Sequence, residues 1–233
     1  MLGVMSATEP AREAAARAAL ERVEPGMTLG LGSGRAVWRT MELARERFDG
    51  DRPLRAAFAS DRTAALGRRL GIGAVELDGD TRLDLAIDGA DEVDPELGLV
   101  KGGGAALLRE KLVVCAADRF LVVAEAGKRV ERLGQAFRLP VEVVRFAWHD
   151  TRRRVLELVP EAELRTGDGG EPVVTDEGHH LLDCRLPAEG DLGELAAALK
   201  ATVGVVEHGL FLDLADEVLL GRDDGGVDVL RRV

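Results

Sequence analysis

Residues 84–111, DLAIDGADEVDPELGLVKGGGAALLREK, carry the strongest indications of both the fold and the chemistry of this chain. The segment opens with an apolar-rich run that ends at Asp88, a pattern typical of a buried strand. It then turns to Asp91, passes three glycines behind Lys101, and enters a predicted helix that carries Glu110. Glycines let backbone N–H groups approach a ligand closely, and a helix start favours anionic groups. Carboxylates, a lysine and bare backbone together suit proton transfer on a phosphorylated small molecule.

This segment resembles the signature of type A ribose-5-phosphate isomerases, in which I-D-G-A-D-E is followed by K-G-G-G-(G/A)-A-L and then by E-K. Every one of these positions is filled here, and the resemblance continues in family order from about Arg12 to the C-terminus. It implies reversible interconversion of D-ribose 5-phosphate and D-ribulose 5-phosphate, a step of the pentose phosphate pathway, through a cis-enediolate. It also implies that the enzyme uses no metal and no other cofactor.

The resemblance implies a role for individual residues. Asp88 and Asp91 assist the opening of the sugar ring, and Glu110 moves a proton between C2 and C1. Lys101 and the glycine amides stabilise the oxyanion that develops. The implied phosphate ligands are Arg12, Ser33, Arg35 and Lys128. The full set of implied substrate contacts is Arg12, Ser33, Gly34, Arg35, Ala36, Asp88, Gly89, Ala90, Asp91, Lys101, Gly102, Gly103, Gly104 and Lys128.

The glycine loop that begins at Gly30 departs from the family pattern. The family loop reads G-x-G-T-G-S-T-A, whereas this chain has GLGSGRAVW, so Ser33 keeps one hydroxyl while Arg35 and Ala36 replace two others. A guanidinium matches the geometry of a phosphate, which would compensate for the lost hydroxyls. The alternative is that Arg35 points to solvent. Taken without the resemblance, such a loop is equally compatible with a nucleotide, a sugar phosphate or a plain tight turn.

Each motif also has a simpler interpretation. The Asp88–Asp91 stretch alone is compatible with a solvated acidic turn or a calcium loop, although Ala90 interrupts the ligand pattern that calcium requires. A helical glutamate such as Glu110, flanked by basic residues, is most often a surface residue, and only the resemblance assigns it a role. Lys128, in AEAGKRVERLG, resembles the family's A-D-x-S-K segment, but it is also compatible with a helix-flanking lysine.

Strands alternate with helices through the first part of the chain, which predicts an α/β fold. The prediction is a Rossmann-like, mostly parallel sheet domain with a second, smaller ferredoxin-like α+β domain. Ligands bind such sheets at the carboxyl ends of the strands, where the Gly32 loop, Ser60, Asp88 and Glu125 are expected to surround one crevice. The expected helices are 8–23, 36–48 and 60–70, and the expected strands are 27–31, 54–59, 74–77, 83–88 and 120–124.

After Pro140 the order changes to β-α-β-β-α-β, the order of a ferredoxin-like unit. The expected strands are 141–146, 163–165, 180–185 and 203–207, with helices at 150–159 and 192–200. We therefore predict that residues 1–138 and 209–233 form the catalytic domain and that residues 139–208 form the small one. Two further family-like segments, Thr175–His179 and Val205–Phe211, are interpreted as a structural hairpin turn and a domain junction.

Composition limits the classes of function. The net charge of −11 argues against nucleic acid as a partner, and no apolar run approaches the roughly 18 to 20 residues of a membrane span. Four scattered histidines and two cysteines predict neither a zinc site nor a disulfide framework. Only four of the 31 basic residues are lysines, and three of these lie at or near the motifs. We expect a cytoplasmic enzyme, and the family implies a homo-oligomer, a dimer or a tetramer.

Two other classes of protein stay open at this stage. A sugar-phosphate sensor on the same kind of core would bind without turnover, but such sensors usually carry a DNA-binding domain, for which this acidic chain has no spare segment. Another enzyme of the same general fold, such as an amino-sugar phosphate deaminase or an acyl-CoA transferase, would need its own catalytic signature. Deaminases add a catalytic histidine, and none lies near these motifs.

Overall fold

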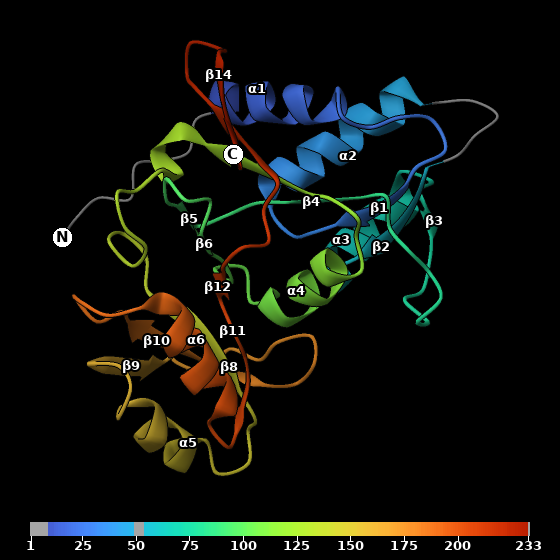
Figure 1. Cartoon of the computed structure of the whole chain (residues 1–233). Coiled ribbons are helices and arrows are strands. Elements are labelled where there is room, and N and C mark those ends of the chain that lie inside the picture. Colours follow the sequence, from blue (N-terminus) through green and yellow to red (C-terminus); the bar gives the residue numbers. More distant parts are fainter. Residues whose placement is uncertain (1–8, 49–53, 233) are drawn as a thin grey trace.

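A seven-stranded sheet forms the centre of the molecule in the computed structural model, which describes residues 9–48 and 54–232 (Figure 1). Its strands are β1 (Thr28–Leu31), β2 (Arg55–Phe58), β3 (Gly73–Ala74), β4 (Leu85–Asp88), β7 (Phe120–Glu125), β13 (Glu217–Gly221) and β14 (Val227–Arg231). They lie in the order β14-β13-β7-β4-β1-β2-β3, and only the β13–β14 pair is antiparallel. The predicted α/β, mostly parallel fold is confirmed.

The order of the strands reverses between β1 and β4. From β1 the chain adds β2 and β3 on one side, and it then crosses to β4 on the other side. At such a switch point the loops after the two strands separate and leave a crevice. Here the two loops are those of Gly32 and Asp88, which are in close contact. A Cβ on Gly32 would lie only 1.9 Å from the Asp88 Cγ, so this position requires glycine.

Helices cover both faces of the sheet. Helices α1 (Glu9–Leu20), α2 (Arg35–Arg47) and α3 (Asp61–Arg69) lie against one face, and α4 (Leu107–Cys115) lies against the other (Figure 1). The Ser60 side chain caps α3 by accepting a hydrogen bond from the Thr63 amide, at 3.1 Å. This cap explains why the chain turns directly from β2 into a helix.

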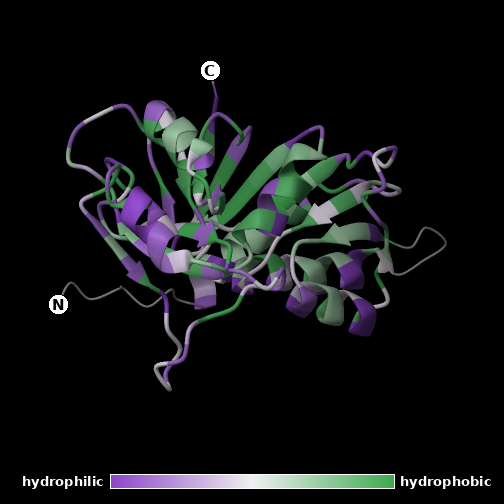
Figure 2. Cartoon of the chain, turned by 90° about the horizontal axis from the view of Figure 1, so that it is seen from below, coloured by the Kyte–Doolittle hydropathy of each residue, from purple (hydrophilic) through white to green (hydrophobic). Residues whose placement is uncertain are grey.

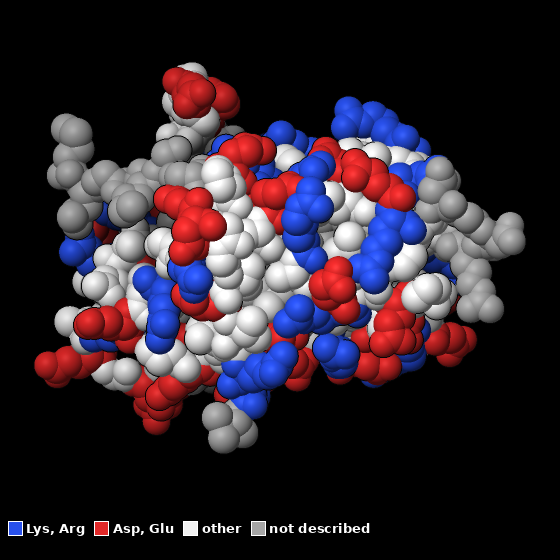
Figure 3. All heavy atoms as spheres, turned by 90° about the horizontal axis from the view of Figure 1, so that it is seen from above, with Lys and Arg blue, Asp and Glu red and all other residues white. Residues whose placement is uncertain are grey.

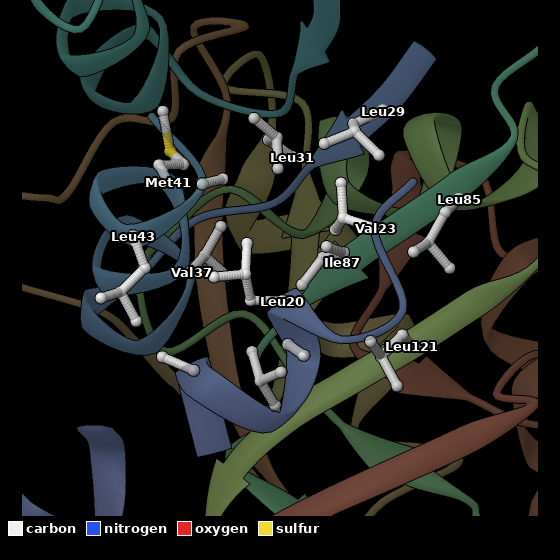
Figure 4. Close-up of a cluster of buried hydrophobic side chains, with 14 of the residues drawn as sticks. Leu20, Val23, Leu29, Leu31, Val37, Met41, Leu43, Leu85, Ile87 and Leu121 are labelled. Carbon is white, nitrogen blue, oxygen red and sulfur yellow. The ribbon is translucent and has the colours of Figure 1, made fainter. Parts of the chain in front are cut away.

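The main core fills the space between the sheet and the α1–α2 layer. Figure 4 shows Leu20 of α1 and Val37 of α2 directed toward Leu31 and Ile87 of the sheet, all of them buried. Figure 2 shows the same division across the molecule, with hydrophobic residues concentrated in the central strands and hydrophilic ones on the outer surfaces. Burial of these apolar side chains holds the helices against the sheet, and it therefore also fixes the loops that precede the helices.

A second sheet of four antiparallel strands lies apart from the first (Figure 1). Its elements are β8 (Leu139–Val143), α5 (Trp148–Val155), β9 (Glu161–Leu164), β10 (His180–Arg185), α6 (Leu192–Ala201) and β11 (Val205–His208). Their order along the chain is the predicted β-α-β-β-α-β. All of these elements fall within 139–208, and the division of the chain into domains at those boundaries stays a prediction.

Several local predictions differ from the structure. The first helix ends at Leu20 rather than at Val23, and its predicted start at Thr8 lies outside the described residues. The strand expected at 74–77 is reduced to two residues at the sheet edge. A third sheet of three short strands was not predicted: β5 (Glu92–Val93), β6 (Leu99–Val100) and β12 (Leu210–Phe211). A two-residue strand carries too little sequence pattern to be recognised.

Acidic and basic side chains alternate on the surface. On the face shown in Figure 3, lysine and arginine residues are interspersed with aspartate and glutamate residues rather than gathered into one basic area. Within the described residues, no helix has both the length and the apolar character needed to cross a membrane.

Candidate active site

A cavity of about 710 Å³ lies at the carboxyl ends of β1, β2, β4 and β7. Three stretches of backbone form most of its wall, namely residues 33–38, 89–91 and 101–106. Glu110 and Lys128 complete the part of the wall that was predicted, and Ser60 and Glu125 also line it. The crevice expected at the strand ends is therefore present. Of the predicted site residues, Asp88 and Arg12 are the two that do not line it.

Lys101 lies at the centre of a buried charged cluster beneath this cavity. Its Nζ lies 2.9 Å from Asp88 Oδ2 and 3.3 Å from Glu110 Oε2, and it donates to the Gly89 carbonyl at 2.7 Å. All three charged side chains are at most 4% exposed. Because one ammonium lies between two carboxylates, the cluster carries an excess negative charge when both carboxylates are ionised, and such a cluster favours uptake of a proton.

The pKa values in the cluster follow from this arrangement. Burial, reinforced by the Asp88 carboxylate, raises the pKa of Glu110 from 4.5 to about 8, although Lys101 opposes the shift. Burial also raises the pKa of Asp88. For Lys101 burial disfavours the ammonium, but Asp88 and Glu110 outweigh it, so its pKa is raised. Glu110 thus has a pKa close to neutrality, which suits a group that must both take up and release a proton.

The backbone of the glycine loop after Lys101 is held open toward the cavity. Gly102 has a φ of +104°, a conformation that favours glycine, and the Gly103 amide donates to Asp91 Oδ2 at 2.8 Å. The amides of Gly102 and Gly104 have no hydrogen-bond partner among the described residues, and both residues line the cavity. An unpaired amide at a cavity wall is a donor available to a ligand.

The loop at the start of α2 forms another part of the cavity wall. The Ser60 hydroxyl donates to the Ser33 hydroxyl at 3.1 Å, and the Ser33 amide donates to Asp88 Oδ1 at 3.1 Å. Gly34 precedes α2 and offers no side chain to cap it, so the helix N-terminus lies at the cavity without a capping side chain from the described part of the chain. Such an N-terminus attracts anions.

Two cationic side chains accompany this helix start. Arg35 is exposed, and Lys128, which ends the short turn η1 (Ala126–Lys128), is partly buried. Both line the cavity, and neither forms an ion pair or a hydrogen bond through its side chain with another described residue. The predicted contacts at Ser33, Gly34, Arg35, Ala36 and Lys128 thus all line this one cavity, and two cations that accompany a helix N-terminus suit a phosphate.

Comparison with known proteins identifies the family. The family model described as ribose 5-phosphate isomerase A (phosphoriboisomerase A) matches residues 56–225. The chain belongs to this family. It is 44% identical to the ribose-5-phosphate isomerase A of Synechococcus sp. (strain JA-3-3Ab), over 98% of this chain and 100% of the relative.

Solved structures of isomerases of this family have the same fold. The ribose 5-phosphate isomerase A of Methanocaldococcus jannaschii superimposes with a TM-score of 0.89 at 33% identity, covering 96% of this chain and 99% of that one. A D-ribose-5-phosphate isomerase in complex with phospho-erythronic acid gives a TM-score of 0.90 at 34% identity, covering 98% of this chain and 100% of that one. The family resemblance inferred from residues 84–111 is confirmed.

Arg12 has a different environment from the phosphate ligand that the family resemblance implied. Its side chain is 8% exposed, its Nε lies 3.4 Å from Glu125 Oε1, and its Nη1 lies 3.2 Å from Glu9 Oε2. Glu125 lines the cavity, so Arg12 is placed directly behind that wall. Direct contact between Arg12 and phosphate stays a prediction.

The cavity is also lined by residues that the sequence did not indicate, and four of them have side chains or positions that bear on the site. Arg62 lies over the Trp38 ring at 4.1 Å, and both side chains reach the cavity from α3 and α2. Val174 and Asp176 come from the hairpin that was interpreted as purely structural, and the Asp61 amide donates to Asp176 Oδ2 at 2.9 Å. The hairpin belongs to the small sheet, so no pattern local to it indicates that it reaches a site on the large one.

Proposed function

We propose that the cavity isomerises D-ribose 5-phosphate and D-ribulose 5-phosphate. The single observation that carries this proposal is the buried Asp88–Lys101–Glu110 cluster, whose Lys101 and Glu110 line the same cavity as an anion-attracting helix start. Groups suited to proton transfer and groups suited to phosphate binding therefore line the same cavity. The family name and the near-complete coverage of its members support the same reaction.

Glu110 is the group proposed to move the proton. As a carboxylate it takes the proton from C2, and the electron pair of the broken C–H bond forms the C1–C2 double bond of a cis-enediolate while the C1 oxygen becomes negative. A proton then passes from the C2 oxygen to the C1 oxygen, and Glu110 returns its own proton to C1. A raised pKa favours both halves of this exchange, since the carboxylate is neither too weak a base nor too weak an acid.

Lys101 and the loop amides are proposed to stabilise the enediolate. The Lys101 ammonium lies 3.3 Å from the Glu110 carboxylate, so a substrate carbon next to that carboxylate has fixed positive charge nearby. The amides of Gly102 and Gly104 add donors that are already oriented, which avoids reorganisation as charge develops. Phospho-erythronic acid, present in the structure of a relative, carries a carboxylate that imitates the two oxygens of the enediolate.

Ring opening is assigned to Asp91, which lines the cavity and is held by the Gly103 amide. Asp88 does not line the cavity, and its Oδ2 lies 2.9 Å from the Lys101 ammonium, so we assign it the orientation of that lysine. Ser33, Arg35 and Lys128 are assigned to the phosphate. The binding energy of the phosphate holds the reacting carbons against Glu110.

Three further expectations belong to this proposal. A cytoplasmic location fits an enzyme of central sugar metabolism, and a homodimer or homotetramer is expected from the family. The reaction is proposed to need no metal. Within the described residues, no group of three or more His, Cys, Asp or Glu side chains is arranged to hold one.

A coupled assay with D-ribose 5-phosphate tests the proposal directly. The purified chain is expected to form D-ribulose 5-phosphate at the same rate before and after exhaustive chelation. Turnover that disappears with chelator and returns with a divalent ion would contradict the metal-independent mechanism. Binding of the sugar phosphate without turnover would favour the sensor instead.

A further inference from the structure

We propose that Arg165 and Asp183, both from the small sheet, position the catalytic glycine loop and thereby set the rate of isomerisation. The inference rests on the proposed function, because it assigns these two residues a part in that reaction. Arg165 directly follows β9, and Asp183 lies on the adjacent strand β10. Neither residue lines the cavity.

Arg165 connects the two sheets through its guanidinium. Its Nη1 donates to the Gly102 carbonyl at 2.8 Å and to the Gly103 carbonyl at 3.3 Å. Its Nε donates to Asp183 Oδ2 at 3.0 Å, and Nη2 donates to Asp183 Oδ1. The guanidinium side chain is only 14% exposed. Asp183 thus holds the guanidinium in one orientation, and the guanidinium holds two successive peptide groups of the loop.

The direction of these peptides decides which groups face the cavity. A trans peptide is planar, so its carbonyl and the following N–H point in opposite directions, and the described chain contains no cis peptide bond. With the Gly103 carbonyl turned toward Arg165, the Gly104 N–H points away from Arg165, and Gly104 lines the cavity. Arg165 therefore holds an oxyanion donor in place from behind.

The same geometry connects Arg165 to Asp91. With the Gly102 carbonyl turned toward Arg165, the Gly103 N–H points the other way, where Asp91 Oδ2 accepts it at 2.8 Å. Gly102 has left-handed backbone geometry and no side chain, so the loop has little stiffness of its own. One guanidinium thus fixes both a donor to the enediolate and the carboxylate assigned to ring opening.

The alternative is that Arg165 only fastens the small sheet to the large one. The structure offers a matched control, because the hairpin makes a second connection between the two sheets. Glu177 Oε1 accepts from Arg109 Nε at 2.5 Å, and Glu177 does not line the cavity. Glu177→Ala removes this connection and leaves the glycine loop bonds intact. Arg185→Ala is a second control, since Arg185 pairs with Glu161 on the same small sheet without touching the loop.

The experiment compares the kinetics of Arg165→Ala, Arg165→Lys, Glu177→Ala and Arg185→Ala on ribose 5-phosphate. Arg165→Ala is expected to lower kcat about 10- to 100-fold with less than about a threefold change in KM, because the phosphate end of the cavity is untouched. Its affinity for phospho-erythronic acid should fall about 10-fold. Arg165→Lys, which keeps the charge but lacks the fork, should recover part of the lost kcat. Both controls should keep the kcat of the parent.

Several outcomes would overturn the inference. A folded Arg165→Ala protein with the kcat and analogue affinity of the parent would do so, as would an equal loss of kcat in Glu177→Ala. If Arg165→Ala does not fold, Asp183→Asn decides instead. It keeps the shape of the side chain but removes the charge that orients the guanidinium, and its kcat should fall about threefold to tenfold. A parent protein that does not isomerise ribose 5-phosphate would contradict the proposed function itself, a result distinct from any difference among variants.

Discussion

The two ends of the site, one proposed for proton transfer and the other for phosphate, hold their charges in opposite ways. At the proton-transfer end, Asp88, Lys101 and Glu110 are almost completely buried and each is within ion-pairing distance of another. At the phosphate end, Arg35 is exposed, Lys128 is partly buried, and neither has an ionic partner among the described residues. The first end is fully assembled before any ligand arrives, whereas the charges of the second end are left for the ligand to neutralise.

The difference follows from what each end must do. Buried charges are strongly penalised unless they are paired, and a water-poor site makes the remaining electrostatic interactions strong. Such a site changes a pKa and stabilises a transition state without having to reorganise. A phosphate arrives from water fully solvated, so the cations that bind it do not have to be buried. They need only carry a positive charge and extend far enough to contact the phosphate. Changes at the first end should therefore act mainly on kcat, and changes at the second mainly on KM.

Glu110→Gln is expected to have the largest effect. The amide keeps the size of the side chain but cannot take up a proton, so kcat should fall by at least about 10²-fold while KM changes only a few fold. Steady-state kinetics with ribose 5-phosphate measures both constants. Glu110→Asp, which keeps the charge but shortens its reach, should also lose activity. A near-normal kcat in Glu110→Gln would mean that Asp91 rather than Glu110 is the base. The buried cluster would then not be the proton-transfer end of the site.

Arg35→Ala is expected to act at the other end and with a smaller effect. Loss of a charge-assisted contact with phosphate should raise KM roughly 10-fold, equivalent to about 1.4 kcal/mol, with a smaller change in kcat. Arg39→Ala is the matched control, because Arg39 lies one turn further along α2 and is paired with Glu13 and Glu42. Any turnover of unphosphorylated ribose should be affected less. Equal KM values for Arg35→Ala and the parent would mean that Arg35 does not contact the phosphate, which would then be bound by the backbone amides, Ser33 and Lys128.

The sequence predicted the fold well because the fold is expressed in long, local patterns. Alternating strands and helices indicated the parallel sheet, and the order of elements after Pro140 indicated the small α+β unit. The three-stranded sheet was missed because its strands have two residues each and its third strand lies over a hundred residues from the others. Pairing at that separation is decided by tertiary packing, for which the local sequence holds no signal.

Glu110 shows why the site was harder to predict than the fold. On the sequence alone it is a helical glutamate between two basic residues, yet the three side chains point in different directions. Arg109 contacts the hairpin of the small sheet, Lys111 donates to Glu207 at 2.8 Å, and only Glu110 faces Lys101. Successive helix residues are about 100° apart, so the neighbours reveal nothing about the one that turns inward.

The contacts made across the two sheets could not be predicted from local sequence at all. Asp176 reaches the cavity and Arg165 reaches the glycine loop from segments whose own patterns indicate a hairpin and a strand end. Arg12 shows the opposite relation. Its position in the family order implies a phosphate ligand, and the structure places its guanidinium beside two carboxylates, Glu9 and Glu125, so its contact with phosphate stays a prediction.

The smallest expected effect concerns stability, and it sharpens the contrast between a buried and an exposed end. The folded state holds a proton on Glu110 up to about pH 8, whereas an unfolded glutamate releases it near 4.5. Between these values the folded state binds more protons, so the stability contributed by this group is complete below pH 4.5 and is lost as pH rises through 8.

Glu110→Gln removes this titration, so the stability of the variant should depend less on pH than that of the parent. The free energy of unfolding of the variant, relative to that of the parent, should therefore rise by about 1 to 3 kcal/mol from pH 5 to pH 9. This is less than the pKa shift of Glu110 alone implies at about 1.4 kcal/mol per pKa unit, because Asp88 and Lys101 titrate together with Glu110. Urea unfolding at the two pH values measures it. Arg35→Ala, at the exposed end, should show the same pH dependence as the parent. If the free energy of unfolding changed with pH in the same way for Glu110→Gln and the parent, the buried cluster would hold no extra proton. Its carboxylates would then be balanced by Lys101 alone.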